Sequence, residues 1–137
     1  MSLAEYQQRL LSALTPGAPV RIDPATRVVA DAIVEHAQLE LTAACPIVTG
    51  LLSFDGRLTG EVRKQLQRHD RPVPVHAWAM QFAARLSTDP DPWVSWAAQV
   101  DAGTLAAAEW RRLIEPTCPG DPMQAMLLIA AGSDPRL

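Results

Sequence analysis

His36 and Glu40 are the two residues whose types and spacing are best suited to chemistry in this sequence. They stand four positions apart, so a helix would place both side chains on one face, one turn apart. A histidine beside a carboxylate can act as a general acid and base, or as two ligands of a metal ion. The sequence offers no third ligand. We therefore expect a buried polar pair that is hydrogen-bonded to itself, or a face left open for a partner protein.

Two other histidines, His69 and His76, flank the connector RPVPV. A metal site would need both to converge with a carboxylate, and the prolines between them give no helical register for that. Histidines at a helix end are the simpler interpretation. Cys45 and Cys118 lie far apart without a CxxC spacing, which predicts neither a disulfide framework nor a zinc cluster. We therefore expect no metal ligands in this chain.

The sequence motifs of common enzyme classes are also missing. The chain contains no GxSxG, HExxH, P-loop or GxGxxG pattern. A Ser-His-Asp triad is assembled in space, so residue spacing alone does not decide whether one exists. The residues by themselves support no catalytic assignment.

Side chains suited to binding a protein or a peptide are easier to find. Trp93 and Trp96 follow a proline-rich corner, and exposed tryptophans near arginine favour a protein interface. Trp78 and Trp110 fall on apolar stripes and are expected in the core. Basic residues between 57 and 71 could bind an acidic peptide or a phosphate, although the acidic residues among them favour a solvated face. The predicted partner- or peptide-binding residues are Arg63, His69, Arg71, His76, Trp93 and Trp96.

The composition predicts one soluble domain. The chain has 137 residues, enough for a single core without disulfides. Its formal net charge of −3 gives no electrostatic case for binding nucleic acid or an acidic membrane surface. The chain has no apolar run of about 18 residues and no basic-then-apolar leader, so we expect a cytoplasmic protein.

Residues 24–52 form the segment around which the rest of the chain is expected to pack. Drawn on a helix, the polar side chains fall in one narrow strip, and apolar side chains cover most of the remaining circumference. Such a helix must be enclosed by other elements. Pro46 falls inside the segment and removes one backbone hydrogen bond. We therefore expect a kink or a break near residues 44–46 and a short second helix from Pro46 to Leu52.

The remaining apolar residues recur at helical spacing, and proline-rich joints separate the segments. They predict helices over residues 2–14, 59–68, 75–86, 92–114 and 122–131, and no β-alternation is found. The predicted fold class is all-α: a compact single domain (1–137) of six to seven helices around a central, proline-kinked helix. The apolar faces expected to pack are Leu58, Val62 and Leu66; Val75, Trp78, Phe82 and Leu86; Trp96, Val100, Gly103, Ala107, Trp110 and Ile114; and Met126, Leu127 and Ala130.

The order of these segments resembles a known family. LAEYQQRLLSAL is followed by LELTAACPIVTGLL, VRKQLQRH, RPVPVHAWAMQFAARL and DPWVSWAAQVDAGTLAAAEW. This succession is similar to the N-terminal helical domain of accessory proteins that accompany multinuclear non-heme iron enzymes in peptide natural-product pathways. Examples are the partner subunits of methanobactin and 3-thiaglutamate (pearlin) biosynthesis. The resemblance rests on Pro46, Ile47, Val48 and Leu51, on the joint from His69 to Pro72, on Phe82 and Leu86, and on the helix start at Trp93.

The resemblance implies a non-catalytic subunit that binds an iron enzyme, as a heterodimer, and helps present a ribosomally synthesised precursor peptide for cysteine modification. The iron ligands would belong to the partner, so no cofactor is expected in this chain. The alternative is a small helical chaperone or a protein-interaction module unrelated to iron enzymes. A small enzyme that uses His36 and Glu40 is a third hypothesis.

Overall fold

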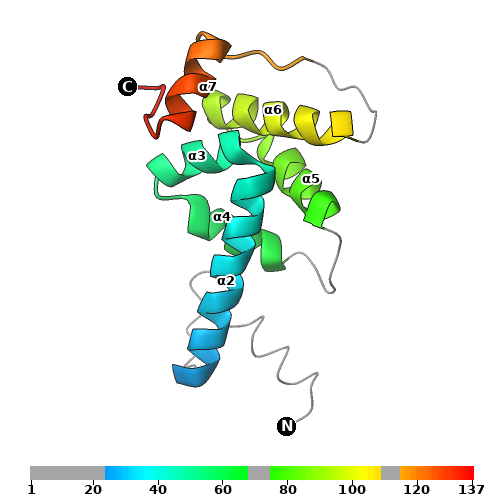
Figure 1. The fold of residues 1–137 in the computed structure, drawn as a ribbon, viewed down its shortest axis with the longest axis vertical. Coiled ribbons are helices and arrows are strands. Elements are labelled where there is room, and N and C mark those ends of the chain that lie inside the picture. The colour runs from blue at the N-terminus through cyan, green and yellow to red at the C-terminus, as the bar shows by residue number, and fades with distance from the viewer. Residues whose placement is uncertain (1–23, 68–74, 109–114) are drawn as a thin grey trace.

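Six helices run through the residues that the structure, a computed structural model, describes: 24–67, 75–108 and 115–137 (Figure 1). They are α2 (Pro24–Ala44), α3 (Pro46–Phe54), α4 (Leu58–Gln67), α5 (Val75–Leu86), α6 (Pro92–Ala108) and α7 (Pro122–Ala130). No strand occurs within these described ranges, so the predicted all-α class is confirmed. The helix expected over residues 2–14 lies outside the described residues, as do residues 109–114 of the helix expected over 92–114.

Proline and aspartate fix where the helices begin. α2, α3, α6 and α7 each start at a proline, whose missing N–H and fixed φ suit the first turn. Asp91 accepts a hydrogen bond from the backbone N–H of Trp93 at 2.9 Å, and Asp121 accepts one from that of Gln124 at 2.9 Å. Because these rules act locally, the predicted helix starts at residues 92 and 122 are confirmed. The predicted start at Val75 is confirmed as well, and α4 starts at Leu58, one residue before its predicted start.

The predicted break at Pro46 is present. α2 ends at Ala44, Cys45 has φ −128° and ψ 65°, and α3 starts at Pro46. The break lets α3 leave the axis of α2 and pack against α6 (Figure 1). α3 continues past the predicted end to Phe54, and a turn at Gly56, with φ 67°, leads into α4.

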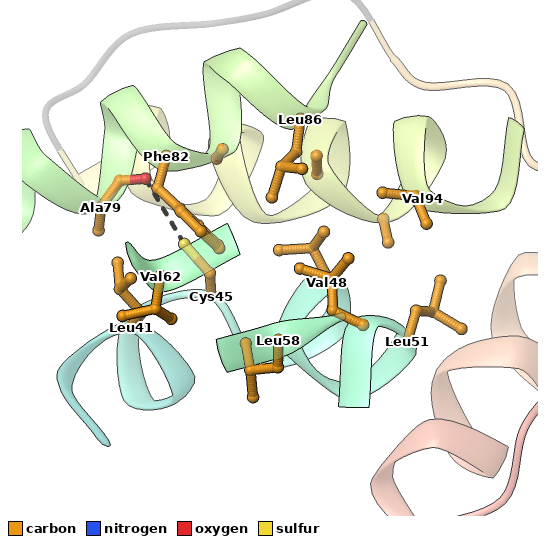
Figure 2. Close-up of a cluster of buried hydrophobic side chains, with 14 of the residues drawn as sticks. Leu41, Cys45, Val48, Leu51, Leu58, Val62, Ala79, Phe82, Leu86 and Val94 are labelled. Atoms are coloured by element: carbon orange, nitrogen blue, oxygen red, sulfur yellow. Dashed lines mark hydrogen bonds between the residues drawn. The ribbon is translucent and has the colours of Figure 1, made fainter. Parts of the chain in front are cut away.

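α3 lies at the centre of the packing, in contact with α2, α4, α6 and α7. α5 packs on α6 and on α2. Figure 2 shows the core, in which apolar side chains from α2, α3 and α4 meet those of α5 and α6. Its labelled members are Leu41, Cys45, Val48, Leu51, Leu58, Val62, Ala79, Phe82, Leu86 and Val94.

In the part of the chain that the structure describes, the core closes over one side of α2 rather than over most of its circumference, which corrects the sequence prediction. Val28 is 67% exposed and Leu39 is 65% exposed, on the side opposite the core. Among the described residues, α3, α4 and α5 contact α2, and burial follows a single stripe along it. The buried side chains of α2 are Ala30, Val34, Ala37 and Leu41.

α7 also buries a different face from the predicted one. Ala125 and Ile129 are buried, whereas Met126 and Leu127 are exposed. The reason is the shape of α3: a Cβ atom built on Gly50 would lie 2.6 Å from the Cγ2 atom of Ile129. The missing side chain at this glycine makes the space into which Ile129 packs.

The buried face of α6 differs from the predicted one and contains many small side chains. The predicted face included Gly103, which meets open space, and Ala107, which is exposed. The buried face is rich in alanine, and small side chains at a contact allow neighbouring helices to approach closely. The buried residues of α6 are Val94, Trp96, Ala97, Ala98, Asp101, Ala102, Leu105 and Ala106.

We predict opposite effects of alanine at Gly50 and at Gly103. A Cβ at Gly103 meets nothing within 4 Å. Helix propensity should then make G103A raise the free energy of unfolding by about 0.5–1 kcal/mol. A methyl group at Gly50 would collide with Ile129, so G50A should lower the same quantity by about 1–3 kcal/mol. Urea titrations followed by circular dichroism measure both. A G50A protein as stable as G103A would show that α7 does not pack on Gly50.

Candidate functional site

Asp101 of α6 is buried in the core, where its carboxylate caps α3. It accepts hydrogen bonds from the backbone N–H groups of Val48, at 2.8 Å, and Ile47, at 3.4 Å. These groups belong to the first turn of α3, where N–H groups have no partner within the helix. Cys45, at the N-cap position, makes no side-chain capping bond. A residue from a different helix therefore supplies the cap.

Burial controls the ionisation of Asp101 and Cys45. Burial raises the pKa of Asp101 to about 7, although the hydrogen bonds from Val48 and Ile47 oppose that shift. Burial, together with the charge of Asp101, raises the pKa of Cys45 to about 12. The Cys45 thiol is therefore protonated at neutral pH and donates to the carbonyl of Ala79 at 3.6 Å (Figure 2). A protonated, buried thiol is a poor nucleophile, so Cys45 contributes packing rather than reactivity.

Glu61 of α4 is a second buried carboxylate, and it ties α4 to α5. It accepts hydrogen bonds from the side chains of Arg85 and Lys64, and its backbone carbonyl accepts another from Arg85 at 3.0 Å. Burial acts to raise the pKa of Glu61, but the bonds from Arg85 and Lys64 outweigh it and hold this pKa below its usual value. The sequence placed Glu61 on a solvated face, and the structure corrects this.

Arg136 fastens the last residues of the chain to the rest of the fold. Its guanidinium donates to both carboxylate oxygens of Asp55, at 2.7 and 2.8 Å, just after α3. It also donates to Asp134 at 2.7 Å and to Asp91 at 3.2 Å, the residue that caps α6. This bidentate, charge-assisted cluster holds the segment after α7 against α3 and α6.

The side chains of His36 and Glu40 are in contact but not buried. The Nε2 atom of His36 lies 2.8 Å from the Oε1 atom of Glu40, as the four-residue spacing predicted. The His36 side chain is 75% exposed, so the predicted burial of this pair is wrong. The reason is the single buried stripe of α2, which leaves His36 on the open side of the helix. The pair is therefore accessible to a partner.

The two tryptophans predicted at an exposed protein interface, Trp93 and Trp96, lie together, and Trp96 is in the core. Trp96 is 2% exposed, so its predicted exposure is wrong. The ring of Trp93, which is half-buried, meets that of Trp96 edge to face, with the centroids 5.9 Å apart. Trp93 also packs against the loop before α7, because a Cβ atom on Gly120 would lie 3.0 Å from its ring. Through Trp93, this pair of tryptophans thus packs against the loop that leads into α7.

The other predicted binding residues are divided among separate segments. Arg63 of α4 is partly exposed, and its Nη2 atom lies 3.9 Å from the Oδ1 atom of Asp31 on α2. His76 is partly buried in the first turn of α5. His69 and Arg71 lie outside the described residues. Binding roles for these four residues stay predictions.

The sequence analysis missed an exposed apolar face on α7. Met123 is 69% exposed and Leu127 is 65% exposed, and Met126 and Ala130 are exposed beside them. We call these four residues the α7 outer stripe. α7 is apolar at nearly every position, so periodicity gave no sign of which side would face outward. On α2, a comparable α2 outer stripe consists of Val28, Ala32, Leu39 and Ala43.

The capping role of Asp101 was also missed, although the sequence carried a signal. Asp101 is the one charged residue between Pro92 and Ala108, and its neighbours one turn away include Ala97, Ala98 and Leu105.

Within residues 24–67, 75–108 and 115–137, no three side chains of His, Cys, Asp or Glu are grouped so that they could hold a metal ion. No described helix combines the length and the apolar character needed to cross a membrane.

The raised pKa of Asp101 predicts that stability depends on pH. The folded protein holds the Asp101 proton more tightly than the unfolded chain does, so protonation favours folding. This contribution is complete below about pH 4 and is lost as the pH rises to about 7. Relative to D101N, which does not titrate here, the wild type should lose about 2 kcal/mol of unfolding free energy between about pH 5 and pH 8.

Urea titrations of wild type and D101N across this range measure the difference. Groups that are the same in both proteins cancel in the comparison, and Glu61, whose pKa is lowered, loses its proton below this window. If the difference between the two proteins stays constant with pH, Asp101 is ionised throughout, and the effect assigned to its burial is wrong.

Comparison with known protein families, with curated proteins and with solved structures finds no match to this chain.

Proposed function

We propose that this chain is a non-catalytic accessory subunit that binds a multinuclear non-heme iron enzyme and helps present a ribosomally made precursor peptide. The observation that carries the proposal is the α7 outer stripe, whose apolar side chains face outward from a helix that is firmly held. Exposed apolar side chains gathered on one helix are a feature of protein-binding surfaces. The order of helical segments resembling such accessory proteins supports the choice of partner.

The buried charged side chains join parts of this chain to one another, which agrees with a binding role. Asp101 caps α3, Glu61 is bonded to Arg85, and Arg136 is bonded to three carboxylates. Each of these groups holds one helix or segment against another. In the proposed complex, the iron would be bound by side chains of the partner, and this chain would contribute surface and rigidity.

The proposal predicts a stable complex with an iron enzyme encoded beside this chain. Co-expressed proteins should elute together in size-exclusion chromatography as a heterodimer. Oxidation of the cysteine-containing peptide should fall by about tenfold or more when this chain is left out. Independent elution, together with full oxidase activity in the absence of this chain, would refute the proposal.

The alternative is a small helical chaperone or interaction module unrelated to iron enzymes, and the same exposed stripe supports it. The identity of the bound protein separates the two functions. Co-elution with an export substrate, in place of a metalloenzyme, would favour the alternative.

A further inference from the structure

The α7 outer stripe has the geometry of a helix-packing seam. Met123, Met126, Leu127 and Ala130 recur at intervals of three and four residues, so they form one continuous strip along the helix. The opposite side, through Ala125 and Ile129, is already packed on α3. α7 therefore has two apolar sides, and the outer one has room for a second helix along its length of about 13 Å.

The helix that carries this strip is held at both ends. Asp121 caps its first turn, and Gly132, with φ 79°, ends it. The N–H of Ser133 then bonds to the carbonyl of Leu128 at 2.8 Å, and Arg136 fixes the following residues to Asp55. A partner would thus meet a surface that is already formed, which lowers the entropy cost of binding.

The described residues before and after α7 in the chain carry more acidic than basic side chains. Residues 115–137 contain three carboxylate side chains, from Glu115, Asp121 and Asp134, and one basic residue, Arg136. Asp121, at the start of α7, is exposed. After the end of α7, the Arg136 guanidinium is shared by Asp134, Asp55 and Asp91, which leaves two negative charges of that cluster uncompensated (three carboxylates against one cation).

We propose that the α7 outer stripe binds an amphipathic helix of a partner protein whose apolar face is flanked by lysine or arginine. The unbranched Met123 and Met126 adapt to an apolar partner surface, and the carboxylates at the two ends of α7 attract its basic flanks. A second copy of this chain fits less well, because it would bring the same acidic residues to the contact. The inference rests on the proposed binding function and names its surface and its partner chemistry.

Two fluorescein-labelled synthetic helices of about 15 residues test this. Both carry the same leucine face, and their polar positions are all lysine in one and all glutamate in the other. Fluorescence anisotropy with the full chain should show that the Leu–Lys helix binds with a Kd on the order of 10 μM at low salt. The affinity should fall as salt is raised, and the Leu–Glu helix should not bind.

Matched variants locate the binding surface. M123Q/L127Q, on the α7 outer stripe, should weaken binding of the Leu–Lys helix by about tenfold or more. V28Q/L39Q replaces equally exposed side chains on the α2 outer stripe and should leave the affinity unchanged. All four positions are exposed, so both variants should keep the fold, and circular dichroism checks this.

Four results would overturn the inference: no binding of the Leu–Lys helix, equally tight binding of the Leu–Glu helix, loss of binding in V28Q/L39Q, or a dimer that M123Q/L127Q abolishes in sedimentation experiments. The last would assign the surface to a second copy. The probes contain no iron enzyme, so the proposed function and this inference fail separately. Peptide binding without enzyme co-elution removes the iron-enzyme partner alone, and the reverse result removes this surface alone.

Discussion

The contact on which the rest of the fold depends is the hydrogen bonding of the Asp101 carboxylate to the first turn of α3. Pro46 creates the need for it, because it starts a new helix whose first-turn N–H groups have no partner within the helix, and Val48 among them is buried. Cys45 lacks a side-chain oxygen, so the acceptor comes from α6. Since α3 also contacts α2, α4 and α7, fixing α3 against α6 sets the position of every helix that packs on α3.

The protein buries charge where two segments must be joined. Burial disfavours the ionised form of Asp101, and the N–H groups of α3 offset part of that cost. Glu61 is instead paired with Arg85, which joins α4 to α5, and Arg136 joins the end of the chain to α3 and α6. These polar contacts are directional, so they specify one arrangement of helices whose apolar faces alone allow several.

The same arrangement explains why apolar side chains remain on the outside. α2 and α7 are apolar on two sides, and the described core closes over one side of each. The outward sides carry large side chains such as Leu39 on α2 and Leu127 on α7. The fold thus combines directional polar contacts in the interior with apolar side chains on the surface, which is the combination expected of the proposed binding subunit.

The sequence by itself determined the helices and where they begin, because proline and aspartate act on the backbone within one turn. The break at Pro46 follows from this local chemistry, and it was predicted correctly. The predicted faces of α4 and α5 are also confirmed, since Val62, Phe82 and Leu86 are buried. Only the tertiary structure decided which side of α2, α6 and α7 is buried. Ile129 rather than Leu127 packs inward because Gly50, on another helix, leaves space for it. The sequence marks Asp101 as a lone charge among apolar residues, but its partners are N–H groups that approach it only when α3 packs on α6. A pattern read along one helix carries no information about the shape of its neighbours.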